Sequence, residues 1–236
     1  MLPRRSQPAT PDGPVPRSNW QLFRERFFRH KVAWISAIVL VVLFVVCFGA
    51  SWVAPYPKNH IDPLLIADAH GPSAKHWFGT TDAGEDVLTQ VLYGGQVSLK
   101  IGLTVALLST MVGVLVGAVA GFFGRWIDQG LSRVTDLFLI VPEIALLALA
   151  LKKLGHTPSW IIVVLAALGW MYIARVVRGQ VMSLKEKEFV EAARATGASN
   201  RRIVLRHILP NCVGSITVNM TLAVATAIVA ESSLSF

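Results

Sequence analysis

The sequence predicts an all-α membrane protein, a polytopic bundle of helices, and three observations support this fold class. Of its 236 residues, 53% are hydrophobic and only 15% are charged, and the mean hydropathy is +0.55. Soluble proteins carry about 25% charged residues, so this chain cannot cover its apolar surface with a polar exterior. The apolar residues also gather in windows long enough to cross a bilayer. Helices are expected there because open strands would leave backbone groups unpaired in lipid.

Five apolar windows are expected to span the membrane: 32–54, 97–123, 136–151, 159–174 and 210–236. The third and fourth are short for a bilayer core that needs about 20 residues. We expect the first window to be retained as an anchor. Its apolar run is longer than the roughly 7–15 residues of a signal peptide, and a basic segment up to Lys31 precedes it.

The lysines and arginines predict that the N-terminus lies in the cytoplasm. With that orientation, the cytoplasmic segments 1–31, 124–135 and 175–209 hold 17 of the 22 basic residues, as the positive-inside rule requires. Topology therefore explains the formal net charge of +8. The main argument for nucleic-acid binding is removed, and we expect no nucleic-acid partner.

The chain is expected to divide into three parts. Residues 1–19 are rich in proline and have no apolar period, which predicts a disordered cytoplasmic tail. Residues 20–31 place aromatic side chains on one helical face among arginines, which predicts an interfacial helix; a plain basic anchor beside the membrane explains the same pattern. Residues 32–236 form the transmembrane domain, with an outer loop at 55–96 and a cytoplasmic loop at 175–209.

Three glycines of the second window, Gly113, Gly117 and Gly121, are four residues apart and share one helical face. Small residues at this spacing let a second membrane helix approach closely, so they predict a helix-packing seam. The alternative is that glycine is simply more frequent in membrane helices.

Charged residues are costly inside a membrane and are often functional. Asp136 and Glu143 are seven residues apart and lie on nearly the same helical face, with Pro142 expected to kink the helix between them. Glu231 lies in the fifth window. These three acids are candidates for a polar translocation path, and the alternative is a structural pair with a neighbouring helix.

Catalytic chemistry is poorly supported. The pair Gly94-Gly95 lacks the lysine of a phosphate-binding loop. His60, His70 and His76 have spacings that match no compact metal site, and they are expected to be solvated loop residues. We therefore expect no catalytic residue, no metal and no cofactor on this chain.

The cytoplasmic loop carries a short helix that ends sharply. Glu188 and Glu191 lie at its start, where acids complement the helix dipole. Gly197 is a natural C-terminal stop, and Ser199 can cap the next helix, which is expected to reach the membrane at Pro210. The alanines make this helix slender enough to enter a groove on another protein. A purely structural loop is the alternative.

The same loop resembles a known family. Glu191-Ala192-Ala193, followed by Gly197 and then Leu209-Pro210, resembles the EAA loop of ABC importer permeases. The longer string EAARATGAS…IVLRHILPN resembles the dipeptide and oligopeptide branch. Further matching strings are HWFGTTDAGEDVL (76–88), LYGGQVSL (92–99), GFFGRWIDQ (121–129), RVTD (133–136), ARVVRGQVMSLKEKEFVEAA (174–193) and AESSLSF (230–236). Together they cover residues 20–236 and are most similar to the C-type permease subunit.

The chain departs from the family pattern in two places. Residues 79–86 contain an extra threonine, and Glu85 stands where the family usually has arginine. The sequence also ends at Phe236, inside a motif that in the family continues toward a sixth span, so that span is expected to be absent from this chain.

The resemblance implies a bacterial cytoplasmic-membrane subunit that forms half of the channel of an ATP-driven importer for di- and oligopeptides. It implies a homologous permease partner, two cytoplasmic ATPase subunits that hold ATP and Mg, and an extracytoplasmic substrate-binding protein. The residues implied in coupling to the ATPases are Glu188, Glu191, Ala192, Ala193, Gly197, Ala198, Leu209 and Pro210. A nickel-chelate or other small-solute importer is an alternative, and a non-transporting membrane scaffold is a second one of a different class.

Overall fold

The computed structural model describes residues 27–140, 142–155 and 157–235, together with their side chains except those of 139, 143, 144, 234 and 235. The predicted tail and most of the predicted interfacial helix lie outside these residues. The described chain is helical, and its contacts divide it into two compact units, residues 1–53 and 54–236. The all-α fold class is confirmed.

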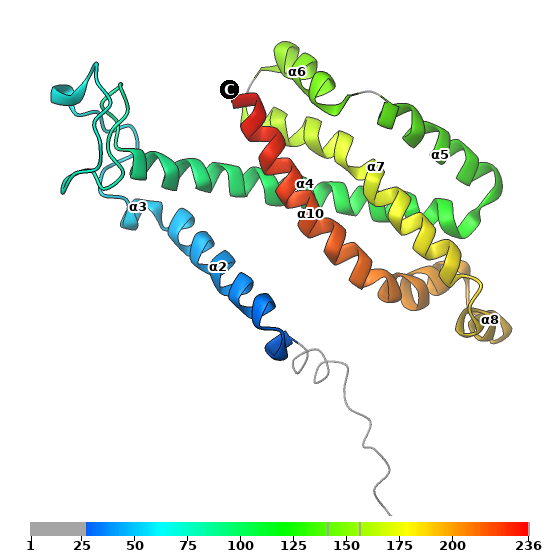
Figure 1. The fold of residues 1–236 in the computed structure, drawn as a ribbon. Coiled ribbons are helices and arrows are strands. Elements are labelled where there is room, and N and C mark those ends of the chain that lie inside the picture. The colour runs from blue at the N-terminus through cyan, green and yellow to red at the C-terminus, as the bar shows by residue number, and fades with distance from the viewer. Residues whose placement is uncertain (1–26, 141, 156, 236) are drawn as a thin grey trace, which may run out of the picture. The chain divides into compact units, whose positions relative to one another are not determined.

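The first unit contains α2 (Lys31–Phe48) and the short α3 (Ala50–Val53), with Gly49 between them (Figure 1). α2 has no polar face: every residue after Lys31 is apolar apart from Ser36, and most of its side chains are exposed within the unit. A helix that is apolar all round is suited to lipid.

The second unit is built around the long helix α4 (Val87–Phe123), which packs against α7 (Pro158–Leu184) and α10 (Leu209–Ser235) (Figure 1). α4 begins at Val87, well before the predicted start of its apolar window at 97. The loop that precedes it, residues 54–86, contains the short 3₁₀ helix η1 (Pro63–Leu65) and is termed here the α3–α4 loop.

The third predicted window is divided between two helices. α5 (Arg125–Ile140) leaves the C-terminal end of α4, and α6 (Glu143–Leu154) follows it back toward the start of α7 (Figure 1). The chain breaks before α6 because Pro142 cannot donate a helical hydrogen bond. The expected kink is therefore an interruption.

Four helices of the described chain are long and apolar enough to cross a membrane: Lys31–Phe48, Val87–Phe123, Pro158–Leu184 and the helical run Asn200–Ser233. The expected count of five spans is not confirmed. α5 and α6 together cover the remaining window, but each is shorter than the other four.

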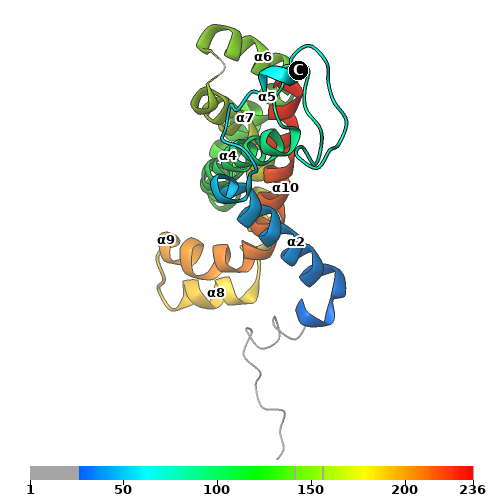
Figure 2. The same ribbon diagram turned by 90° about the vertical axis from the view of Figure 1, so that its left-hand side faces the viewer.

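The segment between α7 and α10 forms a compact end to the bundle. It contains α8 (Glu188–Ala195), the single turn α9 (Asn200–Arg202) and the π-helical η2 (Ile203–Ile208), which runs directly into α10. Figure 2 shows α8 and α9 side by side at this end. The helix after Ser199 was expected to meet the membrane at Pro210, and the structure shows that it continues through Pro210 without a break.

Candidate functional site

The exposed side of α8 carries two acids near its start, together with Phe189, Ala192, Arg194 and Ala195. Glu188 and Glu191 lie in its first turn, and both side chains are exposed together with Ala192. Val190 and Ala193 lie on the opposite face and are buried. One face of this short helix is therefore packed against the protein, and the other is exposed to a partner.

A tight turn fixes the direction in which α8 ends. Gly197 has φ +80°, and its N–H donates to Arg194 O at 2.9 Å while Ala198 N–H donates to Ala193 O at 3.0 Å. This is the Schellman arrangement, which requires a left-handed residue that glycine supplies at least cost. Ser199 then accepts from Arg202 N–H at 3.4 Å and begins the next helix.

A widened helical turn lies just before Pro210. Residues Ile203–Ile208 are π-helical, and proline lacks an N–H and clashes with the carbonyl four residues earlier in a regular helix. The wider turn accommodates the ring, so the helix continues into α10. Isolated π-helical turns are rare and recur at functional sites.

Apolar packing ties α8 to the ends of three long helices. Val190 and Ala193 share one core cluster with side chains from α4, α7, η2 and α10: Ala118, Phe122, Ile173, Val177, Val181, Ile203, Ile208 and Cys212. Arg194 also lies over the Phe122 ring, 5.9 Å from its centre. A displacement of α8 would therefore be felt first by η2 and by Phe122 of α4, and through the shared cluster by α7 and α10.

The three glycines of α4 lie against the backbone of α7. A Cβ on Gly113 would be 2.8 Å from Trp170 O, one on Gly117 would be 2.5 Å from Ala174 O, and one on Gly121 would be 2.7 Å from Arg178 O. Each distance is shorter than a real Cβ contact allows. Close backbone approach of this kind replaces the hydrophobic effect as a source of helix association in lipid.

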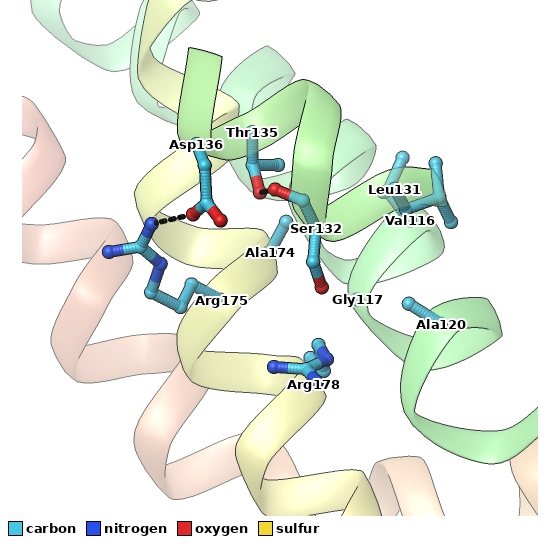
Figure 3. Close-up of a pocket in the computed structure, with 10 residues that line it drawn as sticks. All are labelled: Val116, Gly117, Ala120, Leu131, Ser132, Thr135, Asp136, Ala174, Arg175 and Arg178. Atoms are coloured by element: carbon cyan, nitrogen blue, oxygen red, sulfur yellow. Dashed lines mark hydrogen bonds and ion pairs between the residues drawn. The ribbon is translucent and has the colours of Figure 1, made fainter. Parts of the chain in front are cut away.

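Two acid–arginine pairs join α5 to α7, and Figure 3 shows the one between Arg175 and Asp136. Arg178 donates from Nε and NH2 to the two carboxylate oxygens of Asp128, with the NH2–Oδ2 distance at 2.7 Å. Arg175 donates to Asp136 Oδ1 at 2.6 Å. Asp136, a candidate for the translocation path, thus has a partner on a neighbouring helix. Asp128 was not singled out from the sequence, although a polar stripe on α5 could have indicated it.

The other two candidate path acids lie on α6 and α10. Glu143 is the first residue of α6, and its side chain lies outside the described set. Glu231 is half-buried near the end of α10 and accepts a hydrogen bond from Ser98 Oγ on α4 at 3.0 Å. The structure therefore does not bring the three acids together into one described cluster.

The chain matches two protein families. Residues 113–236 match the binding-protein-dependent transport system inner membrane component, and residues 18–72 match the N-terminal transmembrane domain of oligopeptide transport permease C. The chain belongs to the binding-protein-dependent transport permeases.

Its relatives in that family include oligopeptide, dipeptide and glutathione permeases. It is 40% identical to the oligopeptide transport system permease protein OppC of Mycobacterium tuberculosis over 89% of this chain and 72% of that protein. It is 38% identical to the dipeptide permease DppC of Bacillus subtilis, over 89% and 65% of the two chains. It is 37% identical to the glutathione permease GsiD of Escherichia coli, over 93% and 72%.

The match settles the class of the protein. It is a permease subunit of an inner-membrane transport system of the oligopeptide and dipeptide type, and not a catalytic subunit. No cofactor is expected on a chain of this family, and membership implies ATPase and binding-protein partners.

The permease also contains an apolar cavity of about 710 Å³ between α4, α6, α7 and α10. Most of its walls are aliphatic, and a few polar groups face it, including Ser109, Tyr172 and Asn219. The sequence alone does not reveal this cavity, because its lining comes from helices far apart in the chain and carries no charge.

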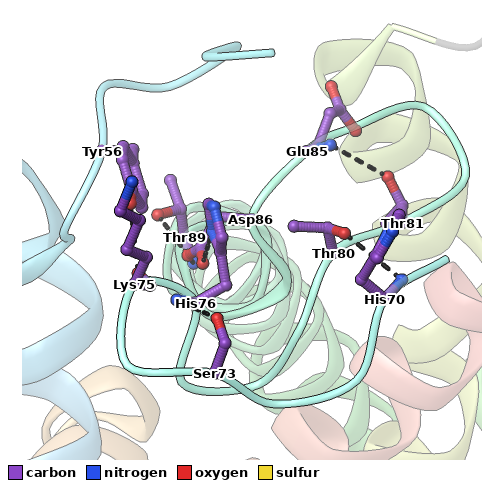
Figure 4. Close-up of polar contacts among 10 residues, drawn as sticks. All are labelled: Tyr56, His70, Ser73, Lys75, His76, Thr80, Thr81, Glu85, Asp86 and Thr89. Carbon is purple, nitrogen blue, oxygen red and sulfur yellow. Dashed lines mark hydrogen bonds and ion pairs between the residues drawn. The ribbon is translucent and has the colours of Figure 1, made fainter. Parts of the chain in front are cut away.

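A buried polar cluster anchors the α3–α4 loop of the permease to the start of α4 (Figure 4). His76 Nδ1 lies 3.0 Å from Asp86 Oδ1, and Asp86 Oδ2 accepts from both the backbone N–H and the hydroxyl of Thr89 at 2.8 Å. Tyr56 stacks on the His76 ring, with centroids 5.0 Å apart, and on His60 at 4.9 Å. The expectation that the loop histidines are solvated is therefore wrong for His76, which is only 5% exposed.

The same cluster shifts the ionisation of Asp86. Burial alone would raise the pKa of this carboxyl, but hydrogen bonds from Thr89 and His76 and the charge of His76 outweigh burial and hold the pKa below its usual value. Asp86 is also the N-cap of α4, where a carboxylate satisfies free N–H groups and complements the helix dipole.

Proposed function

We propose that this permease forms one half of the channel of an ATP-driven importer of di- and oligopeptides and is driven through α8. The observation that carries the proposal is the geometry of α8: an exposed side with two acids near its start, a fixed glycine turn and a buried face that joins three long helices. The peptide relatives support the substrate class.

We propose that the N-terminus and α8 lie on the cytoplasmic side. The basic residues of 1–31, 124–135 and 175–209 support this orientation. In the same proposal, residues 1–19 form a tail, 20–31 an interfacial helix, and 32–236 the transmembrane domain. The α3–α4 loop then faces the side on which a substrate-binding protein would deliver its cargo.

α8 would dock into an ATPase subunit. Glu188, Glu191 and Ala192 present the exposed face, and Ala193 holds the helix to the core. Gly197 and Ala198 set the turn, as the hydrogen bonds described above support. Leu209 and Pro210 would then carry the movement across the π-helical turn into α10. Neighbouring basic groups on the ATPase would complement the two acids.

The full assembly in this proposal contains a homologous permease, two ATPases that hold ATP and Mg, an extracytoplasmic binding protein and the surrounding lipid bilayer. Closure of the ATPases on nucleotide would open the two permeases toward the binding protein, and alternating access would follow. Glu143 and Glu231 remain our candidates for the translocation path, since intramembrane acids usually face the bundle interior. We assign Asp136 to the contact with Arg175.

The test is uptake into membrane vesicles that contain the whole complex and a loaded binding protein. Labelled di- and oligopeptides should be taken up only with ATP and binding protein, and Glu143→Gln should lower uptake while the amount of complex stays the same. Uptake of a nickel chelate without peptide uptake would establish the small-solute alternative. Co-purification without any ATP-dependent uptake would establish the scaffold.

A further inference from the structure

We propose that Asp128 and Arg178 are positioning residues that make α5 follow the movement of α7. A displacement of α8 would in this way also move α5 and α6. This inference rests on the proposed coupling function of α8. It concerns a pair of residues that is remote from the α8 surface and that no step of the proposal above uses.

Polar contacts attach α5 to the bundle. Among the described side chains of α5, only Thr135 is buried, while Trp126, Leu137 and Ile140 are 87%, 66% and 77% exposed. The helix therefore turns its polar side to the protein and its apolar side away from it, an arrangement that suits lipid. Without the acid–arginine pairs, little would join the described part of α5 to α7.

The two acid–arginine pairs differ in exposure and in geometry. The side chains of Arg178 and Asp128 are 31% and 16% exposed and meet through two parallel hydrogen bonds. Those of Arg175 and Asp136 are 52% and 54% exposed and meet through a single described bond. A bidentate, shielded pair fixes geometry far better than an exposed one. Asp128–Arg178 is therefore the principal connection.

The backbone of Arg178 is already held in place by its neighbours on α4. Its carbonyl lies against Gly121 and its N–H against Gly117. The next residues toward α8 include Val181, which shares the buried cluster with Val190 and Ala193. A displacement of α8 would thus shift the Arg178 backbone through close packing. The ion pair between the Arg178 guanidinium and Asp128 would then shift α5.

The contact has room to change. An open pocket of about 170 Å³ lies between α4, α5 and α7, with Gly117, Ser132 and Arg178 among its walls (Figure 3). The chain enters α5 through a turn at Gly124, with φ +62°, and Arg125, with φ +48°. A helix joined by polar contacts beside an open pocket can shift without loss of apolar packing.

The experiment compares single and paired substitutions in vesicles with equal amounts of complex. Asp128→Asn and Arg178→Gln should each lower peptide uptake per ATP hydrolysed by about three- to tenfold, a size typical of changes along a coupling route. The reversed pair, Asp128→Arg with Arg178→Asp, should recover at least half of the loss. Arg133→Gln on the same helix is the control, since Arg133 is exposed and makes no ion pair among the described residues.

Two results would overturn the inference. In the first, the single variants transport as many peptides per ATP as the unmodified complex. In the second, the single variants lower uptake per ATP but the reversed pair recovers none of it, so the loss does not come from the contact between the two side chains. If the unmodified complex shows no binding-protein-dependent uptake, the proposed function itself fails, so the two failures are distinguishable.

Discussion

The α3–α4 loop and the α5–α7 contact each contain a pair of an aspartate with a basic residue, and the two pairs differ in how far they are buried. In the loop, Asp86 and His76 are almost completely buried, with side chains 1% and 6% exposed, and Thr89 satisfies the remaining oxygen of the carboxylate. Between α5 and α7, Asp128 and Arg178 are only partly shielded, and Arg178 borders an open pocket. The enclosed pair fixes a loop on a helix end. The open pair holds two helices together while leaving them room to shift.

The largest effect is expected from breaking the enclosed pair. Asp86→Ala removes the α4 cap and leaves His76 buried without its partner. Breaking a buried pair from one side costs about 3–5 kcal/mol. Hydrogen exchange of residues 54–86 should rise strongly, while Asp68→Ala, at an exposed acid of the same loop, should leave it unchanged. Equal exchange in both variants would contradict a fixing role for the cluster.

A bulky residue in the glycine seam should push α4 away from α7, next to the Asp128–Arg178 contact. Gly117→Leu would place a side chain 2.5 Å from the Ala174 carbonyl, and because backbone cannot move aside cheaply, the cost should reach or exceed about 1–3 kcal/mol. We expect less assembled complex after purification. Gly94→Leu, at a glycine of the same helix with nothing within 4 Å, is the matched control. Unchanged assembly for Gly117→Leu would contradict a need for close approach of α4 and α7 at this position.

Low pH should destabilise the α3–α4 loop by protonating Asp86. Its pKa is lowered in the folded protein, so the stability that it contributes is complete above the ordinary value of about 3.8 and is lost as the pH falls through the lowered value. Exchange protection of the α3–α4 loop, corrected for the intrinsic rate, should fall in that range. The Asp86→Asn variant should lack this acid step, and an identical step in the variant would show that another group is responsible.

The smallest effect is expected at the exposed pair. Asp136→Asn removes a pair whose side chains are about half exposed, and such pairs contribute about 0.2–1 kcal/mol. Uptake per ATP should therefore fall by less than in the Asp128→Asn variant. A loss as large as that of Asp128→Asn would show that exposure does not distinguish the two pairs and that Asp136 has a direct role.

The sequence predicted those parts of the fold that depend on local pattern. Long apolar runs located α2, α4, α7 and α10, and the glycine and serine of the α8 segment predicted its turn and cap, because both depend on residues close in the chain. The enclosed position of His76 could not be predicted in the same way, since it depends on a tyrosine and an aspartate that only folding brings near. The Asp128–Arg178 pair joins residues 50 positions apart, and spacing alone does not reveal it.

The most direct test of the account concerns α8. Glu191→Lys reverses a charge on its exposed face, and Gly197→Val places a β-branched residue at φ +80°, which resists that conformation. Both should reduce uptake per ATP hydrolysed in vesicles with equal amounts of complex. Gly197→Asn, which tolerates a left-handed backbone, and Glu186→Lys, at an exposed acid outside α8, should remain coupled. If Glu191→Lys and Gly197→Val both transport at the unmodified rate per ATP, α8 is not the element through which this permease is driven.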